Sequence, residues 1–386
     1  MPLPVGVKPF SSPSSATDPS VDQDQREMRI APDGEHIALT QIRRTAGGIP
    51  TGVGIVGKLV RGDHSYRVDD ARVVAVDGEL KGFTPTGRGI MFARFLGAFE
   101  AGNPDDVAIN LGHGRERRLT TALDWEEDVD LSPRRYRGSR WMVVGSARGT
   151  GLLETVSQVR RPTFIEEGIR ALPFAVFANN TAAIAEPWLV DEHDTLGGSL
   201  GQPLGALDQG WDARSTTRWK PDGTALLFWQ KRVDGDQTGV VIARLTSRRA
   251  KAPEPSHSTP TPTWAPPLAG YVPPDRTLPT VHRGKVSGEV RITQGPSLRP
   301  DYQKVIEVVY ARYSDVRGFV VDGVERAYYD QPGLYGGRSL YSAMVGVSGN
   351  HHGYLKALNV AINTGSIQGT IESEVDGHHL SLGPLP

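Results

Sequence analysis

The feature that most constrains the fold is a tight turn that opens directly onto an apolar strand and recurs along the chain. Residues 217–230 read TRWKPDGTALLFWQ. Pro221 pre-sets its φ for the second turn position, Asp222 can hydrogen-bond to its local backbone, and Gly223 takes a positive φ at no steric cost. The strand that follows has apolar residues on both faces. This pattern predicts burial on both sides, within a layered β structure.

Weaker copies of this segment lie upstream. They read RIAPDGEHIALTQI (residues 29–42), GFTPTGRGIMFARF (82–95) and DLSPRRYRGSRWMVVGSA (130–147). The turn prolines stand at positions 32, 85, 133 and 221, so the last gap is close to twice the others. The spacing predicts a degenerate copy near residues 175–185 and five units in all. A period of about 45–50 residues with this strand content is typical of a β-propeller.

The Pro-Asp-Gly turn followed by a hydrophobic strand resembles the TolB-like, or PD40, β-propeller repeats. The resemblance covers residues 25–250, with two full copies, one Pro-Thr-Gly copy and one expanded turn. It implies a propeller but leaves the activity open, because such propellers include peptidase accessory domains, sugar-active enzymes and binding scaffolds. The alternative is a set of unrelated hairpins in an all-β sandwich.

Composition divides the chain further. Residues 251–280 are crowded with Pro, Ser and Thr, so they can form neither a helix nor a central strand. Trp264 and Tyr271 predict that this linker is pinned on the propeller surface. Residues 281–386 hold short β-rich runs at about ten-residue intervals, typical of a β-sandwich-like domain, unless the first of them close a sixth blade. We therefore expect an all-β chain: a disordered arm (1–24), a five- or six-bladed β-propeller (25–250), the linker and the C-terminal domain.

Charge and composition exclude several classes. The chain has 43 basic and 44 acidic residues, which argues against a nucleic-acid binder. It has no cysteine, so disulfides, thiolate chemistry and cysteine zinc sites are excluded. The sequence contains no run of 18 apolar residues, so it predicts no membrane span. The N-terminal residues lack the pattern of a signal peptide. They are typical of a disordered Pro/Ser arm, or of the mature end of an exported protein, and the sequence leaves the compartment open.

Polar residues collect just before the repeated turns, where the innermost strand of each unit enters the channel. Five positions before the prolines stand Glu27, Leu80, Asp128 and Thr216; six before stand Arg26, Glu79, Glu127 and Ser215. Loops from all blades converge at such a mouth, where propeller ligands commonly bind.

The most acidic of these segments is LDWEEDVDLSP, residues 123–133. Carboxylates this close raise the pKa of at least one of them. An acid, a second carboxylate and an aromatic platform suit glycoside cleavage. The alternative is a solvated acidic loop, or ion pairs with arginines of neighbouring blades. The segment GWDAR (210–214) repeats the Trp-Asp pair.

A second cluster, EPWLVDEHDTLGG (186–198), places His193 among carboxylates. Such a histidine can act as a general base or bind a divalent cation. No recognised metal motif supports the cation, so we expect no cofactor.

We therefore predict a carbohydrate-active enzyme, a glycoside hydrolase or a lyase-like enzyme, that acts on an oligosaccharide or a small molecule. The alternatives are a non-catalytic propeller that binds a ligand, glycan or protein, and a cyclase or isomerase of an apolar substrate at the domain junction. The candidate catalytic residues are Asp128, Glu27, Asp212 and His193; the candidate substrate-binding residues are Trp125, Trp211, Trp188, Arg26, Arg214, Glu79 and Asp130.

Overall fold

The computed structural model is predominantly β, as expected, and its described residues also include a short helix, α1 (Glu154–Ser157). It describes residues 10–13, 18–95, 104–162, 164–165, 169, 172–173, 175, 186–193, 200–205, 209–275, 277–330, 337–363 and 365–385, except the side chains of residues 95, 214 and 215. No helix in these ranges is long and apolar enough to cross a membrane.

Four sheets follow one another along the first two thirds of the chain. The first has the order β1-β5-β4-β3-β2 and contains β1 (Phe10–Ser11), β2 (Val21–Ile30), β3 (His36–Arg44), β4 (Pro50–Arg61) and β5 (Tyr66–Val76). The second contains β6 (Gly78–Phe83), β7 (Gly89–Phe95), β8 (Pro104–Asn110) and β9 (Glu116–Arg118). The third contains β10 (Glu126–Leu131), β11 (Trp141–Ser146), β12 (Glu186–Asp191) and β13 (Gln202–Pro203). The fourth contains β14 (Trp211–Trp219), β15 (Ala225–Arg232) and β16 (Thr238–Arg244).

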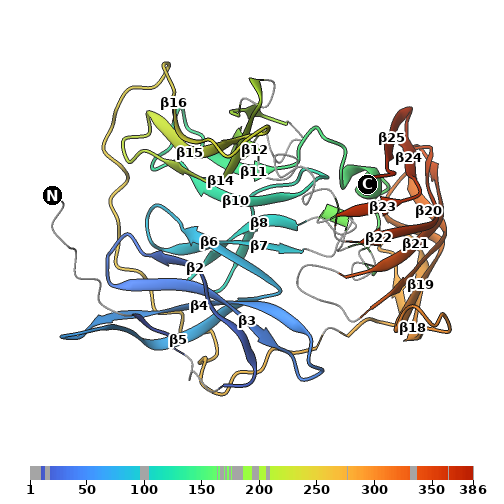
Figure 1. The fold of residues 1–386 in the computed structure, drawn as a ribbon, viewed down its shortest axis with the longest axis horizontal. Coiled ribbons are helices and arrows are strands. Elements are labelled where there is room, and N and C mark those ends of the chain that lie inside the picture. The colour runs from blue at the N-terminus through green and yellow to red at the C-terminus, as the bar shows by residue number, and fades with distance from the viewer. Residues whose placement is uncertain are drawn as a thin grey trace.

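These four sheets, which we call the fan, pack side by side like consecutive blades (Figure 1). Their first long strands touch in chain order, β2 against β6, β6 against β10, and β10 against β14. Apolar cores fill the spaces between neighbouring sheets. Among the described residues no further sheet closes the fan into a ring.

The repeated turn has the geometry that the sequence predicts. Gly34, Gly87 and Gly223 have φ of 75°, 76° and 75°. Each donates its N–H to the carbonyl three residues earlier, over 2.9 Å. In the expanded copy the corresponding residue is Gly138, with φ of 87°. Glycine is needed at these positions because a side chain is strained at positive φ.

The number of units differs from the expectation. The degenerate copy expected near residues 175–185 falls largely outside the described residues. The strands on either side of it, β11 and β12, pair in register within the third sheet, with Met142 opposite Val190. The doubled spacing between Pro133 and Pro221 therefore reflects a long insertion between these two strands.

The strand after the Pro221 turn is buried on one face only. In β15, Leu226 and Phe228 are buried, whereas Leu227 and Trp229 keep 40% and 42% of their surface exposed. The prediction of burial on both faces is wrong for this strand. Its second face has no neighbouring sheet among the residues that the structure describes.

After β16 the Pro-rich segment runs back across the turns of all four sheets. Residues 251–275, which we call the strap, donate backbone N–H groups from Lys251 to Asp222 O (3.3 Å) and from Glu254 to Pro133 O (3.0 Å). His257 N then donates to Thr86 O over 3.0 Å, and Thr259 N to Asp33 Oδ2 over 2.8 Å. Further along, the Trp264 indole donates to Leu111 O over 2.8 Å, and Ala265 and Leu268 enter the cores of the fan.

The C-terminal strands form one curved sheet of nine strands rather than two facing sheets (Figure 1). Its order is β17-β18-β19-β20-β21-β22-β24-β25, with β23 on β22. The strands are β17 (Val281–Arg283), β18 (Ser287–Pro296), β19 (Lys304–Val316), β20 (Phe319–Tyr329), β21 (Ser339–Gly349), β22 (Gly353–Asn363), β23 (Ser366–Gln368), β24 (Ile371–Val375) and β25 (His378–Leu382).

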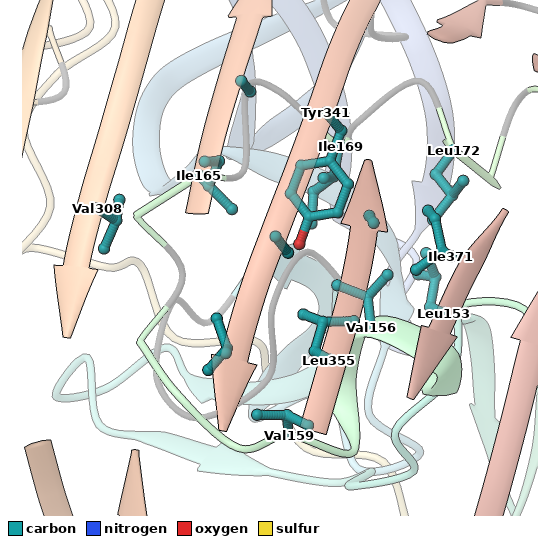
Figure 2. Close-up of a cluster of buried hydrophobic side chains, with 14 of the residues drawn as sticks. Leu153, Val156, Val159, Ile165, Ile169, Leu172, Val308, Tyr341, Leu355 and Ile371 are labelled. Carbon is teal, nitrogen blue, oxygen red and sulfur yellow. The ribbon is translucent and has the colours of Figure 1, made fainter. Parts of the chain in front are cut away.

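The insertion of the third sheet covers this C-terminal sheet in place of a second layer. Leu153, Val156, Ile165 and other apolar residues of the insertion pack with buried residues of the sheet, including Tyr341 (Figure 2). The expected sandwich is therefore a single sheet, whose core is completed by a segment from the fan. The sequence pattern could not show this, because the covering segment lies more than a hundred residues away.

One fully buried ion pair crosses this core. Arg161 of the insertion donates to both carboxyl oxygens of Glu325, over 2.7 and 2.6 Å. The Tyr310 hydroxyl donates to Glu325 over 2.7 Å, and Tyr341 donates to the other oxygen. Arg161 also donates to two carbonyl oxygens of its own segment. The pair is thus balanced in charge and richly hydrogen-bonded.

Candidate functional site

The four inner strands of the fan share an irregularity just before their turns. The pairing register shifts between Arg26 and Arg29, Leu80 and Gly82, Glu127 and Asp130, and Arg214 and Arg218. Bulges of this kind redirect side chains and are frequent next to active sites. At the bulges of β2 and β10, Glu27 and Asp128 have φ of 53° and 62°. Two of the four residues aligned five before the prolines, Glu27 and Asp128, thus share one unusual conformation.

The bulges of β6 and β10 bring carboxylates together around a lysine that the sequence analysis did not select. Lys81 is buried, with 1% of its side chain exposed. Its Nζ lies 3.1 Å from Glu79 Oε2 and 3.4 Å from Asp128 Oδ1, and it pairs more closely with Glu127. Three carboxylates from two neighbouring sheets therefore share one ammonium group. We call Glu79, Lys81, Glu127 and Asp128 the Lys81 cluster.

Burial and charge perturb the pKa values of the Lys81 cluster in opposite directions. Burial alone would lower the pKa of Lys81, but the charges of Asp128, Glu127 and Glu79 outweigh it and hold that pKa well above its usual value. Burial raises the pKa of Glu127 to about 7, against the opposing charge of Lys81. Glu127 nevertheless keeps 26% of its side chain exposed, so solvent reaches this carboxyl. A carboxyl that titrates near neutrality is suited to general acid–base chemistry.

A further carboxyl lies beneath the cluster. Asp106 of β8 is fully buried, and neither of its oxygens has a hydrogen-bond partner in the structure. Burial raises its pKa well above the usual range, and the charges of Glu126, Asp128 and Glu127 add to this effect. Burial without a hydrogen-bond partner therefore favours the protonated form of Asp106.

Two arginines of β2 lie beside the Lys81 cluster. Arg26 pairs with Glu79 over 2.9 Å, and Arg29 with Glu27 over 2.7 Å. Burial raises the pKa of Asp130 to about 6, although the nearby charge of Arg218 lowers it. Asp130 accepts a hydrogen bond from the Trp219 N–H over 2.9 Å, which links the third sheet to the fourth.

The structure therefore brings together four of the predicted site residues and connects a fifth to them. Glu79 and Asp128 are in the Lys81 cluster, and Arg26 contacts Glu79. The charge of Glu27 acts on Lys81. The Trp125 indole donates to Glu127 over 3.0 Å, but its ring is only 7% exposed and packs in the core below the C-terminal sheet.

The other predicted residues lie elsewhere or are undescribed. Asp212 is buried at the start of β14. Burial raises the pKa of Glu186, and the nearby charge of Asp212 adds to that effect. Trp211 beside it stacks under the Arg232 guanidinium, 5.5 Å from the ring centre. The side chain of Arg214 is outside the described residues.

Trp188 lies on β12, the third strand of its sheet, and His193 follows that strand, away from the inner strands. Trp188 is half-buried on β12 and packs against the core between the second and third sheets. His193 directly follows that strand and is exposed, with its N–H donated to Asp191 Oδ1 over 2.8 Å. Neighbouring Glu192 pairs with Arg117 and Arg135. Glu192 is thus engaged in ion pairs and Asp191 in a local turn.

Sequence reasoning missed Lys81 and Asp106. Lys81 stands four residues before Pro85, in GELKGFTP, as the one cation of an otherwise apolar and acidic inner strand. That position was a usable signal. Asp106 gave none, because an acidic pair after Pro104 reads as an exposed loop.

Comparisons with known proteins add little to this geometry. No protein-family model matches the chain, and no curated protein matches it. Among solved structures, the chain is similar to a xylan beta-1,4-xylosidase from Bacillus halodurans C-125, at 10% identity and a TM-score of 0.30, over 90% of this chain and 76% of that one. A likeness at that TM-score carries no argument. Within the described ranges, no group of three or more histidine or acidic side chains is placed to hold a metal ion.

Proposed function

We propose that the chain is a carbohydrate-active enzyme whose acid–base residues are Glu127 and Asp128, carried by an open propeller of the TolB-like, PD40 type. The observation that supports this proposal is the Lys81 cluster. Two of its carboxyls contact the same ammonium group, so they lie close enough to act together on one bond. One of them, Glu127, titrates near neutrality.

The two carboxyl groups take different roles in this proposal. Glu127, protonated below a pKa of about 7, donates its proton to the leaving oxygen of the substrate. Asp128, 3.4 Å from the Lys81 ammonium, acts as base or nucleophile. Arg26 and Glu79, paired beside them, supply hydrogen bonds to sugar hydroxyls. Lys81 holds the acidic groups in position.

The test is turnover on a panel of aryl glycosides and oligosaccharides, with the wild type and two variants. Glu127→Gln and Asp128→Asn should each lower kcat at least about a hundredfold, the scale of general acid–base catalysis. Turnover of the wild type should fall as pH rises above about 7. The control is Glu307→Gln, which removes a carboxylate from an exposed ion pair with Arg326 on the C-terminal sheet.

A non-catalytic binding scaffold is the second candidate, and the burial of Trp125 favours it. A ring that is 7% exposed cannot serve as the stacking platform that glycoside cleavage uses. If Asp128→Asn and Glu127→Gln lose stability but keep turnover per folded molecule, the cluster is an ion-pair network between blades. If the wild type cleaves nothing on the panel but binds one of its glycans, the scaffold is the correct reading.

A further inference from the structure

The outer edges of the fan sheets differ in how they are protected. The outermost strands β1 and β13 are two residues long, and β13 contains Pro203. The outermost strand of the second sheet, β9, has three residues, all charged. Short, charged or proline-containing strands are the usual means of preventing edge-to-edge pairing. Three of the four sheets use them.

The fourth sheet has no such protection. Its outermost strand β16 has seven residues, TGVVIAR, without proline and with a charge only at its last position, Arg244. It pairs with β15 along its length, and no described strand lies on its other side (Figure 1). The chain leaves β16 across the turn of the same sheet, with Leu245 N donating to Thr224 O over 2.9 Å. The free edge of β16 is therefore open to another strand.

The exposed face of this sheet is apolar as well. Val240 and Ile242 of β16 are 73% and 52% exposed. They stand directly opposite Trp229 and Leu227 of β15, whose surfaces are also partly exposed. These four side chains form one patch on the face that turns away from the third sheet. An open edge next to an apolar patch marks an interaction surface.

We propose that β16 pairs antiparallel with β16 of a second copy of this chain, centred on Val241. In this register Val240 stands opposite Ile242 of the second copy, so the two apolar patches join across the edge. Thr238 stands opposite Arg244 of the second copy, so no like charges meet. The strand is thus self-complementary in length, apolar pattern and charge. That property favours a second copy over an unrelated peptide, and it gives a two-fold dimer.

The absence of cysteine makes a direct test available. In the proposed register the two Val241 residues face each other, about 4.5–5.5 Å apart at Cα. That separation lies within the range of a disulfide. Val241→Cys in the full chain should therefore form a cross-linked dimer under mild oxidation. Gly235→Cys, at an open position in the β15–β16 hairpin, is the control. Its two copies would lie on the order of 40 Å apart, so they should not cross-link.

Sedimentation velocity between about 1 and 100 μM completes the test. The wild type should dimerise, and Ile242→Lys should weaken the dimer about tenfold or more. Met344→Lys, which changes an equally exposed residue within the C-terminal sheet, should leave it unchanged. A wild type that stays monomeric throughout would overturn the proposal. A dimer in which Val241→Cys does not cross-link would also overturn it, since that dimer would use another surface.

Discussion

The fan and the C-terminal sheet both bury charged groups, but they balance them differently. In the C-terminal sheet, Arg161 and Glu325 form a pair in which both side chains are 0% exposed and both carboxyl oxygens accept additional tyrosine hydrogen bonds. In the fan, Lys81 is shared by three carboxylates, and Asp106 below them has no hydrogen-bond partner. One site is matched in charge and the other carries excess acid.

This difference in charge balance indicates that the Arg161–Glu325 pair is a structural anchor and that the Lys81 cluster is a candidate functional site. The Arg161–Glu325 pair connects the insertion of the third sheet to the sheet that it covers, and its satisfied hydrogen bonds lower the cost of burying charge. Burial raises the pKa values of Glu127 and Asp106, and the neighbouring carboxylates add to this effect, so the Lys81 cluster works against folding. Perturbed groups of this kind cluster at functional sites. The comparison predicts that substitutions in the two regions affect different properties.

The largest effect on stability is expected at the anchor. Arg161→Met removes the cation and leaves Glu325 buried without compensation, so the free energy of unfolding should fall by about 3–5 kcal/mol. Urea denaturation measures this loss. Arg326→Met, which breaks an exposed pair with Glu307 on the same sheet, should cost no more than about 1 kcal/mol.

A double variant shows whether Arg161→Met destabilises the protein through the unpaired charge of Glu325 or only through lost packing. Arg161→Met with Glu325→Leu removes both charges, and it should recover part of the stability that Arg161→Met loses. If Arg161→Met alone is as stable as the wild type, Glu325 has another means of compensation. The contrast between the two regions would then have to be abandoned.

The second prediction concerns the pH dependence of the fan. Burial raises the folded-state pKa of Glu127 from 4.5 to about 7. A group with a raised folded-state pKa stabilises the protein fully below its unfolded pKa, and this contribution is lost as pH rises through the folded pKa. Glu127→Gln has no such group. Its stability relative to the wild type should therefore rise between pH 4.5 and 7, by about 1–3 kcal/mol.

Urea midpoints at pH 5 and pH 8 measure this difference. The same experiment on Glu307→Gln provides the control, because that carboxylate is exposed and paired on the other sheet. Parallel profiles for the wild type and Glu127→Gln would show that Glu127 ionises in the folded protein at its ordinary pKa. The acid role proposed for this residue would then lose its physical basis.

Local rules predicted the turns and strands well, because both depend on residues close in sequence. The Pro221–Gly223 turn, its copies and the all-β content all follow from short-range steric preferences. The count of units did not follow, because a spacing pattern cannot distinguish a degenerate blade from an insertion between β11 and β12. The single C-terminal sheet was also missed, since residues 281–386 do not show that Leu153 and Val156 would cover it.

The candidate site could be predicted only in part, for a similar reason. Alignment on the prolines found Glu27, Glu79 and Asp128, because repeated units place equivalent residues at the same end of neighbouring inner strands. It could not find Lys81, whose role depends on a bulge and on carboxylates from the neighbouring sheet. His193 was selected for its acidic neighbours in sequence, but in space Glu192 pairs with two arginines instead.

The smallest expected change in stability concerns a substitution in the repeated turn itself. Gly223 has φ of 75°, and a Cβ added there would meet only Pro133 Cγ, at 3.8 Å, so space is not the constraint. Gly223→Val should nevertheless lower the free energy of unfolding by about 1–2 kcal/mol, because a β-branched residue is strained at positive φ. Gly235→Val is the matched control: it also lies in a turn region of the fourth sheet, with open space around it and no positive φ. It should leave stability within about 0.5 kcal/mol of the wild type. Equal melting temperatures for Gly223→Val and the wild type would mean that residue 223 adopts an ordinary φ. The repeated turn would then not require glycine, and the prediction of repeated units from this turn would lose its steric argument.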